Sequence, residues 1–211
     1  MPLFFWQFVA IVGGYLLGSV NFAVLASRVF GLEDPREYGS GNPGATNVLR
    51  SGAKHVALIV LVLDVLKGWL PVALVGDLGP GLGLGAGSGA AALTGLATFI
   101  GHLFPVFFGF KGGKGVATGL GVVLALSPWL GLAALVVFGI VLAATRYVSL
   151  ASMAAAAAAP LIMLLPGPWG HSVLAVVAFL VMAALLIWRH RANIERLRAG
   201  TEAKFGSPKT E

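Results

Sequence analysis

The sequence contains no cysteine and little charge. Of its 211 residues, 14 are Lys or Arg and 8 are Asp or Glu. The missing cysteines exclude disulfide frameworks, thiolate zinc sites and cysteine nucleophiles. Hydrophobic residues make up 58% of the chain and charged residues 10%, against roughly 45–50% and about 25% in soluble domains. So few charges cannot coat so apolar a chain, which excludes a soluble enzyme, a disordered tail and a nucleic-acid reader despite the net charge of +6.

Long apolar stretches separate the charges into blocks. The stretches cover about residues 3–27, 56–76, 88–108, 115–145 and 147–188. Each is long enough, or nearly so, to cross about 30 Å of hydrocarbon as a helix, and the last two exceed what one crossing needs. The sequence therefore predicts an integral membrane protein.

The positions of the basic residues predict the topology. Thirteen of the 14 lie in four polar segments, namely 28–54, 111–114, Arg146 and 189–211. Short loops rich in Lys and Arg stay cytoplasmic, so an even number of crossings must separate neighbouring segments. The chain must then turn near residues 77–87, at Ser127-Pro128 and at Pro166-Gly167-Pro168, where Pro and Gly interrupt the helical pattern.

These turns predict an all-α fold in one domain over residues 1–211. The fold would be a polytopic membrane helix bundle of seven transmembrane helices, with the N-terminus outside and the C-terminus in the cytoplasm. Two spans over residues 115–145 would be short, at about 22 Å each. A single span there would leave six and move the Arg-rich tail outside, which the charge rule disfavours.

The first polar segment with chemical character, residues 40–50, reads SGNPGATNVLR. Glycine lets backbone N–H groups turn toward an anion, and Arg50 supplies a planar fork for phosphate. A surface turn followed by a helix cap explains the pattern about equally well. The candidate ligands are Ser40, Asn42, Gly44, Thr46, Asn47 and Arg50.

The second segment, residues 101–118, reads GHLFPVFFGFKGGKGVAT. Glycines interleave with two lysines before a helical run, a combination that suits a phosphate cradle. It is not a P-loop, because Gly115 follows Lys114. A flexible loop with positive-inside lysines explains the lysines but not the glycines. The candidate binding residues are His102, Lys111, Gly112, Gly113, Lys114 and Gly115.

The third segment, residues 189–202, reads RHRANIERLRAGTE. Helical spacing puts Arg189, Asn193 and Arg196 on one stripe. A basic helix at the membrane edge grips anionic lipid, a role that we assign to Arg191, Arg196 and Arg198. Lipid anchoring needs neither His190 nor Asn193, which makes them functional candidates.

Two opposite charges, Asp64 and Lys67, lie inside the second apolar stretch. They are three residues apart on one helical face. Intramembrane charges are costly and normally pair, so we favour mutual neutralisation at a helix contact over a proton or ion relay. Four scattered histidines with few neighbouring carboxylates disfavour a metal site.

Together, segments 40–50, 101–118 and 189–202 closely resemble the three signature motifs of the bacterial acyl-phosphate:glycerol-3-phosphate acyltransferase family. The resemblance implies an enzyme of the bacterial inner membrane, with its active site facing the cytoplasm. It would transfer a fatty acyl group from acyl phosphate to the 1-hydroxyl of glycerol 3-phosphate. The products would be lysophosphatidate and inorganic phosphate, in the first step of phospholipid synthesis.

The resemblance also implies the site residues and partners. Ser40, Arg50, His190 and Asn193 match catalytic positions, the Gly-Lys loop matches the glycerol 3-phosphate site, and Glu202 matches a further functional position. We expect no cofactor, no metal and no nucleic acid. The expected partners are glycerol 3-phosphate, fatty acyl phosphate, membrane lipids and, functionally, the enzyme that makes acyl phosphate.

The chemistry of this reaction leaves two questions open. The general base could be His190, His102 or an oxygen of a substrate phosphate, which has a second pKa near 6. Ser40 suits a phosphate or hydroxyl ligand better than a nucleophile, because an activated donor gains little from an acyl-enzyme. A small-anion or lipid transporter with a cytoplasmic phosphate site is the alternative function.

Overall fold

The structure is a computed structural model that describes residues 3–77, 88–167 and 173–206. The described residues contain helices and no strands, which confirms the all-α prediction. Two of the predicted turns lie mostly or partly outside these ranges, namely the turn near residues 77–87 and the end of the turn at residues 166–168. The helices are α1 (Leu3–Gly18), α2 (Phe22–Val29), α3 (Ala45–Arg50), α4 (Lys54–Asp77), α5 (Ser88–Leu103), the 3-10 helix η1 (Val106–Phe108), α6 (Val116–Leu126), α7 (Pro128–Thr145), α8 (Val148–Met163), α9 (Val173–Arg189) and α10 (Arg191–Arg198).

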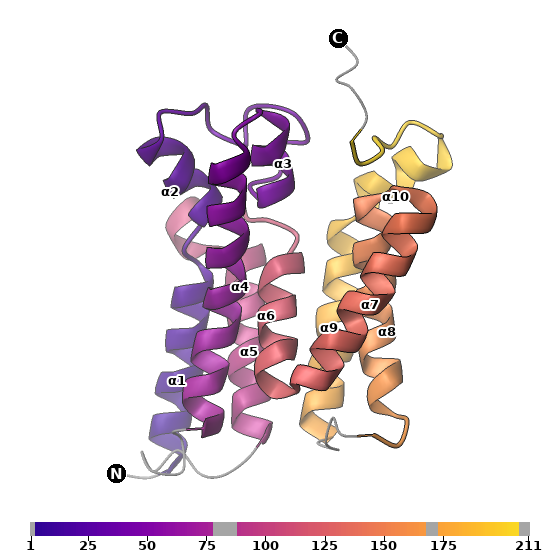
Figure 1. Cartoon of the computed structure of the whole chain (residues 1–211). Coiled ribbons are helices and arrows are strands. Elements are labelled where there is room, and N and C mark those ends of the chain that lie inside the picture. Colours follow the sequence, from indigo (N-terminus) through magenta and orange to yellow (C-terminus); the bar gives the residue numbers. More distant parts are fainter. Residues whose placement is uncertain (1–2, 78–87, 168–172, 207–211) are drawn as a thin grey trace.

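The long helices form one bundle with two groups (Figure 1). Helices α1, α4, α5 and α6 pack together on one side, and α7, α8 and α9 pack together on the other. Contacts of α5 with α9 and of α6 with α7 join the groups. The short helices α2, α3 and α10 all lie at the same end of the bundle. The polar segments that carry chemistry are therefore gathered at that end.

The outer surface of the bundle is apolar. Phe8, Leu58 and Ile140 are each at least 60% exposed, the reverse of what a water-soluble bundle shows. Three helical segments, Lys54–Gly76, Gly89–Phe108 and Pro128–Thr145, are individually long and apolar enough to cross a membrane. Counting the bent pairs α1–α2 and α9–α10 as single spans gives five, and α6 and α8 are shorter apolar helices. The described part of the chain is thus built for a membrane.

The predicted turn within residues 115–145 is where the helix breaks. Helix α6 ends at Leu126, α7 begins at Pro128, and the chain reverses direction between them (Figure 1). Ser127 caps α7 by accepting a hydrogen bond from the Leu130 N–H at 3.4 Å, and proline suits the first helical position. The two helices have 11 and 18 residues, instead of two equal halves.

The first apolar stretch, predicted as one span over residues 3–27, is broken in the structure. Helix α1 ends at Gly18, and α2 starts at Phe22 with its axis bent by 44°. At the break, the side chain of Asn21 accepts a hydrogen bond from the Val24 N–H at 3.2 Å and starts a new helix. Helix α2 therefore leaves the line of α1 before the first polar segment.

Glycines let the backbones of neighbouring helices approach closely. A β-carbon at Gly18 of α1 would collide with the carbonyl of Thr98 in α5, and one at Gly68 of α4 would collide with the carbonyl of Thr118 in α6. Small residues at helix contacts are the usual means of close packing in membranes. Helices α1, α4, α5 and α6 thus hold fixed positions, and so do the segments at their ends.

Candidate functional site

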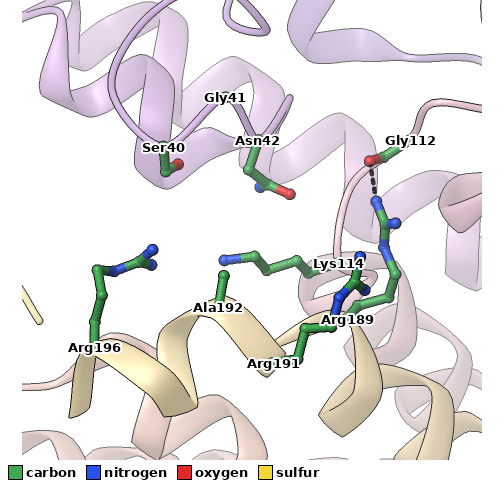
Figure 2. Close-up of a pocket in the computed structure, with 9 residues that line it drawn as sticks. All are labelled: Ser40, Gly41, Asn42, Gly112, Lys114, Arg189, Arg191, Ala192 and Arg196. Atoms are coloured by element: carbon green, nitrogen blue, oxygen red, sulfur yellow. Dashed lines mark hydrogen bonds between the residues drawn. The ribbon is translucent and has the colours of Figure 1, made fainter. Parts of the chain in front are cut away.

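The three polar segments meet at one pocket of about 200 Å³ (Figure 2). Ser40 and Asn42 lie on one side of it, and Lys114 and Arg196 point into it from the other side. The residues that line it are Ser40, Gly41, Asn42, Gly112, Lys114, Arg189, Arg191, Ala192 and Arg196. Segments far apart in the chain thus contribute to a single polar cavity at the end of an apolar bundle.

A buried asparagine shapes the first segment. Asn47 is 1% exposed, and its amide donates to the carbonyls of Pro35 at 2.7 Å and Tyr38 at 3.1 Å. Its side-chain oxygen accepts from the Ser40 N–H at 3.0 Å and from the Ser40 hydroxyl at 3.2 Å. Asn47 therefore lies beneath the loop and orients Ser40, whereas sequence reasoning named it as a substrate ligand.

Three glycines of the second segment are explained by packing. A β-carbon at Gly112 would collide with the carbonyl of His102, one at Gly113 with the ring of His102, and one at Gly115 with the ring of Phe99. Gly115 also has φ of 84°, which favours glycine. The Gly113 N–H donates to the carbonyl of His102 at 3.1 Å. That amide is thus already engaged within the loop.

Arg189, the last residue of α9, holds the second segment in place. Its guanidinium donates to the carbonyls of Gly112 at 2.6 Å and Gly113 at 3.1 Å. Neutral carbonyls cannot cancel its charge, so Arg189 adds a positive charge to the pocket that it lines. Sequence reasoning gave Arg189 no role, because nothing in the spacing links it to a loop 76 residues away.

A chain of hydrogen bonds orients Lys114. Its ammonium donates to the side-chain oxygen of Asn193 at 2.5 Å, and the amide of Asn193 donates to Glu202 Oε1 at 2.6 Å. Ser149 donates to the same Oε1 at 2.6 Å, and Arg196 donates to Oε2 at 2.7 Å. Because Glu202 accepts from the amide, the Asn193 oxygen must face Lys114. We call Lys114, Asn193, Arg196, Glu202 and Ser149 the pocket network.

Charge and burial shift the pKa values in this network. Burial, together with the guanidinium groups of Arg196 and Arg50, lowers the pKa of Lys114 to about 8. Burial alone would raise the pKa of Glu202, but hydrogen bonds from Ser149, Asn193 and Arg196 outweigh it and hold that pKa below its usual value. The carboxylate is therefore charged, and the ammonium loses its charge in mildly alkaline solution.

His190 joins the end of α9 to α10 and is 3% exposed. Its Nδ1 lies 2.8 Å from the carbonyl of Leu186, which can only accept, so Nδ1 carries the proton and Nε2 is the free acceptor. Burial lowers the pKa of His190 to about 4, against the opposing effect of the Leu186 hydrogen bond. At neutral pH the ring is uncharged.

The remaining candidates lie around the pocket rather than in its wall. Lys111 and Thr46 are exposed, and His102 is buried behind the Gly113 loop. Gly44 precedes α3 as its N-cap residue. Arg50 lies in the last turn of α3, near enough to Lys114 to lower its pKa. The pocket lining thus includes Ser40, Asn42, Gly112 and Lys114 from the predicted set.

Two assignments from the sequence change in the structure. Arg196, assigned to lipid, is ion-paired with Glu202 and lines the pocket. Arg191 also lines the pocket and stacks over the ring of Trp188, 4.9 Å from its centroid. Ser149, which the sequence analysis missed, lies in α8 and is isolated from the other polar segments along the chain. The position of Arg189 and Arg196 on one helical stripe with Asn193 was the feature of the sequence that could have indicated their place at the pocket.

The pocket is suited to phosphate groups. Lys114, Arg189, Arg191 and Arg196 bring four positive charges to it, and the carboxylate of Glu202 offsets one of them. Hydroxyl and amide groups from Ser40 and Asn42 face these cations (Figure 2). Charge-assisted hydrogen bonds to phosphate are roughly twice as strong as neutral ones, and arginine matches phosphate with two parallel donors. The arrangement can bind and align anionic phosphate esters.

Comparisons with known proteins agree with this chemistry. A family model described as glycerol-3-phosphate acyltransferase matches residues 8–200. Proteins named glycerol-3-phosphate acyltransferase from Paraburkholderia phytofirmans and Thiobacillus denitrificans are 54% and 50% identical to the chain. Their alignments cover 95% and 93% of this chain and 91% and 96% of those proteins.

Two crystal structures of PlsY (YgiH), an integral membrane glycerol 3-phosphate acyltransferase, are similar to the whole fold. The glycerol 3-phosphate form has a TM-score of 0.85 at 42% identity, covering 95% of this chain and 96% of that one. The lysophosphatidic acid form has a TM-score of 0.83 at 41% identity, covering 95% of both chains.

Proposed function

The chain belongs to the glycerol-3-phosphate acyltransferase family, and from this premise we propose that it transfers a fatty acyl group from acyl phosphate to the 1-hydroxyl of glycerol 3-phosphate. The oxygen of that hydroxyl attacks the acyl carbon, and the bond from this carbon to the phosphate oxygen breaks. The products are lysophosphatidate and inorganic phosphate. The observation that carries the proposal is the meeting of three polar segments, with four cations, at one pocket.

Two anionic substrates repel each other, so the first task of the site is neutralisation. Lys114, Arg50 and the arginines of the third segment supply the charge. Ser40 and Asn42 face them across the pocket and serve as hydrogen-bonding ligands (Figure 2). Fixing both phosphates places the hydroxyl on the acyl carbon, and such positioning is worth orders of magnitude in rate. The Gly113 amide is engaged with the carbonyl of His102 and is not available to these phosphates.

The proton of the hydroxyl goes to a phosphate oxygen of a substrate. The pKa of His190 is about 4, too low for an efficient base at neutral pH, whereas a phosphate monoester has a second pKa near 6. His190 is buried outside the pocket lining and is held by the carbonyl of Leu186, so we assign it a positioning role where α9 joins α10. His102, buried behind the loop, acts as support for Gly113. These assignments make Ser40, Arg50, His190 and Asn193 a positioning and charge-stabilising set.

The size of the pocket separates the two ends of the donor. About 200 Å³ is smaller than the roughly 300–1,000 Å³ of sites for drug-sized ligands. It suits glycerol 3-phosphate and the phosphate end of a donor, and the fatty chain stays in the bilayer beside the apolar helices. The enzyme thus works at a membrane face, which we propose is the cytoplasmic face of the bacterial inner membrane.

A seven-span topology fits this orientation. Helices α4, α5 and α7 with the pairs α1–α2 and α9–α10 supply five spans, and the shorter α6 and α8 supply two more. The basic residues of all four polar segments then share one side, as the positive-inside rule requires. The C-terminal segment lies with the site in the cytoplasm, and the N-terminus lies outside.

The decisive experiment measures products from purified protein in detergent. Palmitoyl phosphate with radiolabelled glycerol 3-phosphate should give lysophosphatidate and one phosphate for each ester formed. Palmitoyl-CoA in place of palmitoyl phosphate, and glycerol in place of glycerol 3-phosphate, should give none. Ester formed from palmitoyl-CoA alone would contradict the donor. The same protein reconstituted into vesicles provides the second measurement. Uptake of glycerol 3-phosphate into these vesicles without ester formation would contradict the reaction and favour a transporter.

A further inference from the structure

A second polar cluster lies within the bundle, apart from the pocket lining. Lys67 of α4 is 3% exposed, and its ammonium lies 2.7 Å from Asp64 Oδ1. The same oxygen lies 3.7 Å from His102 Nδ1, and Thr118 Oγ1 lies 3.1 Å from that nitrogen. We call Asp64, Lys67, His102 and Thr118 the core cluster. It joins α4, α5 and α6 by their side chains.

One end of the core cluster fixes the break between α1 and α2. The Lys67 ammonium donates to the carbonyl of Val20 at 2.7 Å and lies 5.4 Å from the ring centroid of Phe22. The Val24 N–H, which would continue the helix onto Val20, donates to Asn21 instead. A carbonyl released at a helix end needs another donor in an apolar setting. Lys67 is that donor.

This contact is transmitted to the first polar segment by packing. Ala23 of α2 and Val48 of α3 are both fully buried and pack together against Val60 of α4. Helix α3 carries Asn47, which holds Ser40 in place. Densely packed interiors transmit shifts instead of absorbing them. The place where α2 starts therefore sets the place of Ser40.

The other end of the core cluster supports the second polar segment. The ring of His102 lies against Gly113, and its carbonyl accepts the Gly113 N–H at 3.1 Å. Asp64 and Thr118 face Nδ1, which sets the orientation of the ring. Lys114 follows Gly113 directly. The rotation of His102 therefore sets the place of the Lys114 backbone.

We propose that Asp64 and Lys67 are positioning residues for the acyl transfer, which set the distance between the two sides of the phosphate pocket. Through Val20 they fix the side that carries Ser40, and through His102 they fix the side that carries Lys114. The inference rests on the proposed function. It goes beyond mutual neutralisation, because a pair that only cancelled its charges would need neither Val20 nor His102.

The first test replaces the pair without leaving a lone buried charge. The double variant Asp64→Asn/Lys67→Met keeps similar volumes and loses the donor to Val20. The variant enzyme, purified in detergent and checked for folding by gel filtration and thermal unfolding, should show KM for glycerol 3-phosphate raised at least tenfold. A role in stability alone would lower Tm and leave KM unchanged in the folded enzyme. Folded double variant with wild-type KM and kcat would overturn the proposal.

A second pair of variants decides the matter if the double variant does not fold. Thr118→Val removes the hydroxyl facing His102 with almost no change of shape. Thr94→Val is its matched control, because Thr94 is 1% exposed and its hydroxyl oxygen has no hydrogen-bond partner among the described residues. Thr118→Val should raise KM about threefold, and Thr94→Val should leave it unchanged. Equal KM values for both variants and wild type would overturn the positioning role.

The two proposals fail in different ways. Wild-type protein that makes no ester from palmitoyl phosphate contradicts the proposed function. In that case the dissociation constant of glycerol 3-phosphate, measured from its effect on thermal unfolding, replaces KM in the same comparison. Active wild-type enzyme with unaffected variants contradicts the positioning role alone.

Discussion

The core cluster and the pocket network are both built around a lysine and a carboxylate, yet their charges are arranged differently. In the core cluster, Lys67 and Asp64 lie 2.7 Å apart and cancel each other. In the pocket, Lys114 reaches Glu202 only through Asn193, and three arginines line the same cavity. The paired charges of the core cluster stabilise contacts between helices. The excess positive charge of the pocket is available to bind an anionic ligand.

Removal of the pocket lysine should have the largest effect. Lys114→Met loses a charge-assisted hydrogen bond to phosphate, worth about 1.5–3 kcal/mol, so kcat/KM should fall about 100-fold. The matched control is Lys111→Met, three residues earlier in the same loop, whose side chain is exposed and does not line the pocket. Its loss should stay below about fivefold. The measurement is kcat/KM in steady-state assays with palmitoyl phosphate. Similar decreases for both variants would show that a lysine in the pocket contributes no more than an exposed lysine in the same loop.

The next largest effect should come from the single carboxylate of the pocket network. Glu202→Gln keeps an oxygen that can accept from Asn193 but leaves Arg196 without its ion pair. Arg196 is then free to turn and Asn193 less firmly oriented. We expect a loss of about 2 kcal/mol in transition-state binding, or about 30-fold in kcat/KM. The measurement is the kinetics of the purified variant, with Glu195→Gln, an exposed acid of α10, as the control. Equal activity of the two variants would show that Glu202 does not contribute to catalysis through Arg196 and Asn193.

The pH dependence should follow from Lys114. Its pKa is lowered to about 8, so the ammonium is charged below pH 8 and neutral above it. Binding of the phosphate dianion should therefore weaken as pH rises through 8, and kcat/KM should be about tenfold lower at pH 9 than on the plateau. Lys114→Arg should remove this alkaline limb, because arginine stays charged. An unchanged limb in that variant would assign the titration to another group.

The smallest effect should come from the rim of the pocket. Arg191 is exposed and stacks over Trp188, where solvent screens its charge. Arg191→Gln should raise KM for glycerol 3-phosphate about threefold, and 0.5 M KCl should largely abolish the difference from wild type. A decrease in kcat/KM as large as that of Lys114→Met would show that the exposed Arg191 contributes as much to substrate binding as the lysine inside the pocket.

Much of the fold was predictable because it depends on composition and spacing. Blocks of apolar residues predicted the membrane helices, and Ser127-Pro128 marked the break between α6 and α7. The break between α1 and α2 was missed, because Ser19 and Asn21 interrupt the apolar stretch too briefly to change its average. It depends on the capping side chain of Asn21 and on Lys67, which donates to the carbonyl of Val20, 47 residues earlier in the chain.

The site was predictable in its segments and less so in the tasks of its residues. Motif spacing brought out Ser40, Asn42, Gly112 and Lys114, which line the pocket. It could not show that Asn47 is buried beneath Ser40, because the sequence does not distinguish a buried asparagine of a polar loop from one that faces a ligand. It also missed Ser149, whose contact with Glu202 joins residues 53 positions apart. Such tasks follow from packing between distant segments.

The shortness of α6 has a consequence for the reacting groups. Its 11 residues extend about 16 Å, half of the about 30 Å of a hydrocarbon core. In the proposed seven-span arrangement, a chain that turns at Ser127 near one leaflet would reach Gly115, which follows Lys114 of the pocket, at the depth of the other leaflet's acyl tails. The pocket would then lie below the headgroups, or the bilayer would thin around it. In either case, the proposed acyl phosphate, anchored by its tail, would present its mixed anhydride to the pocket without leaving the lipid.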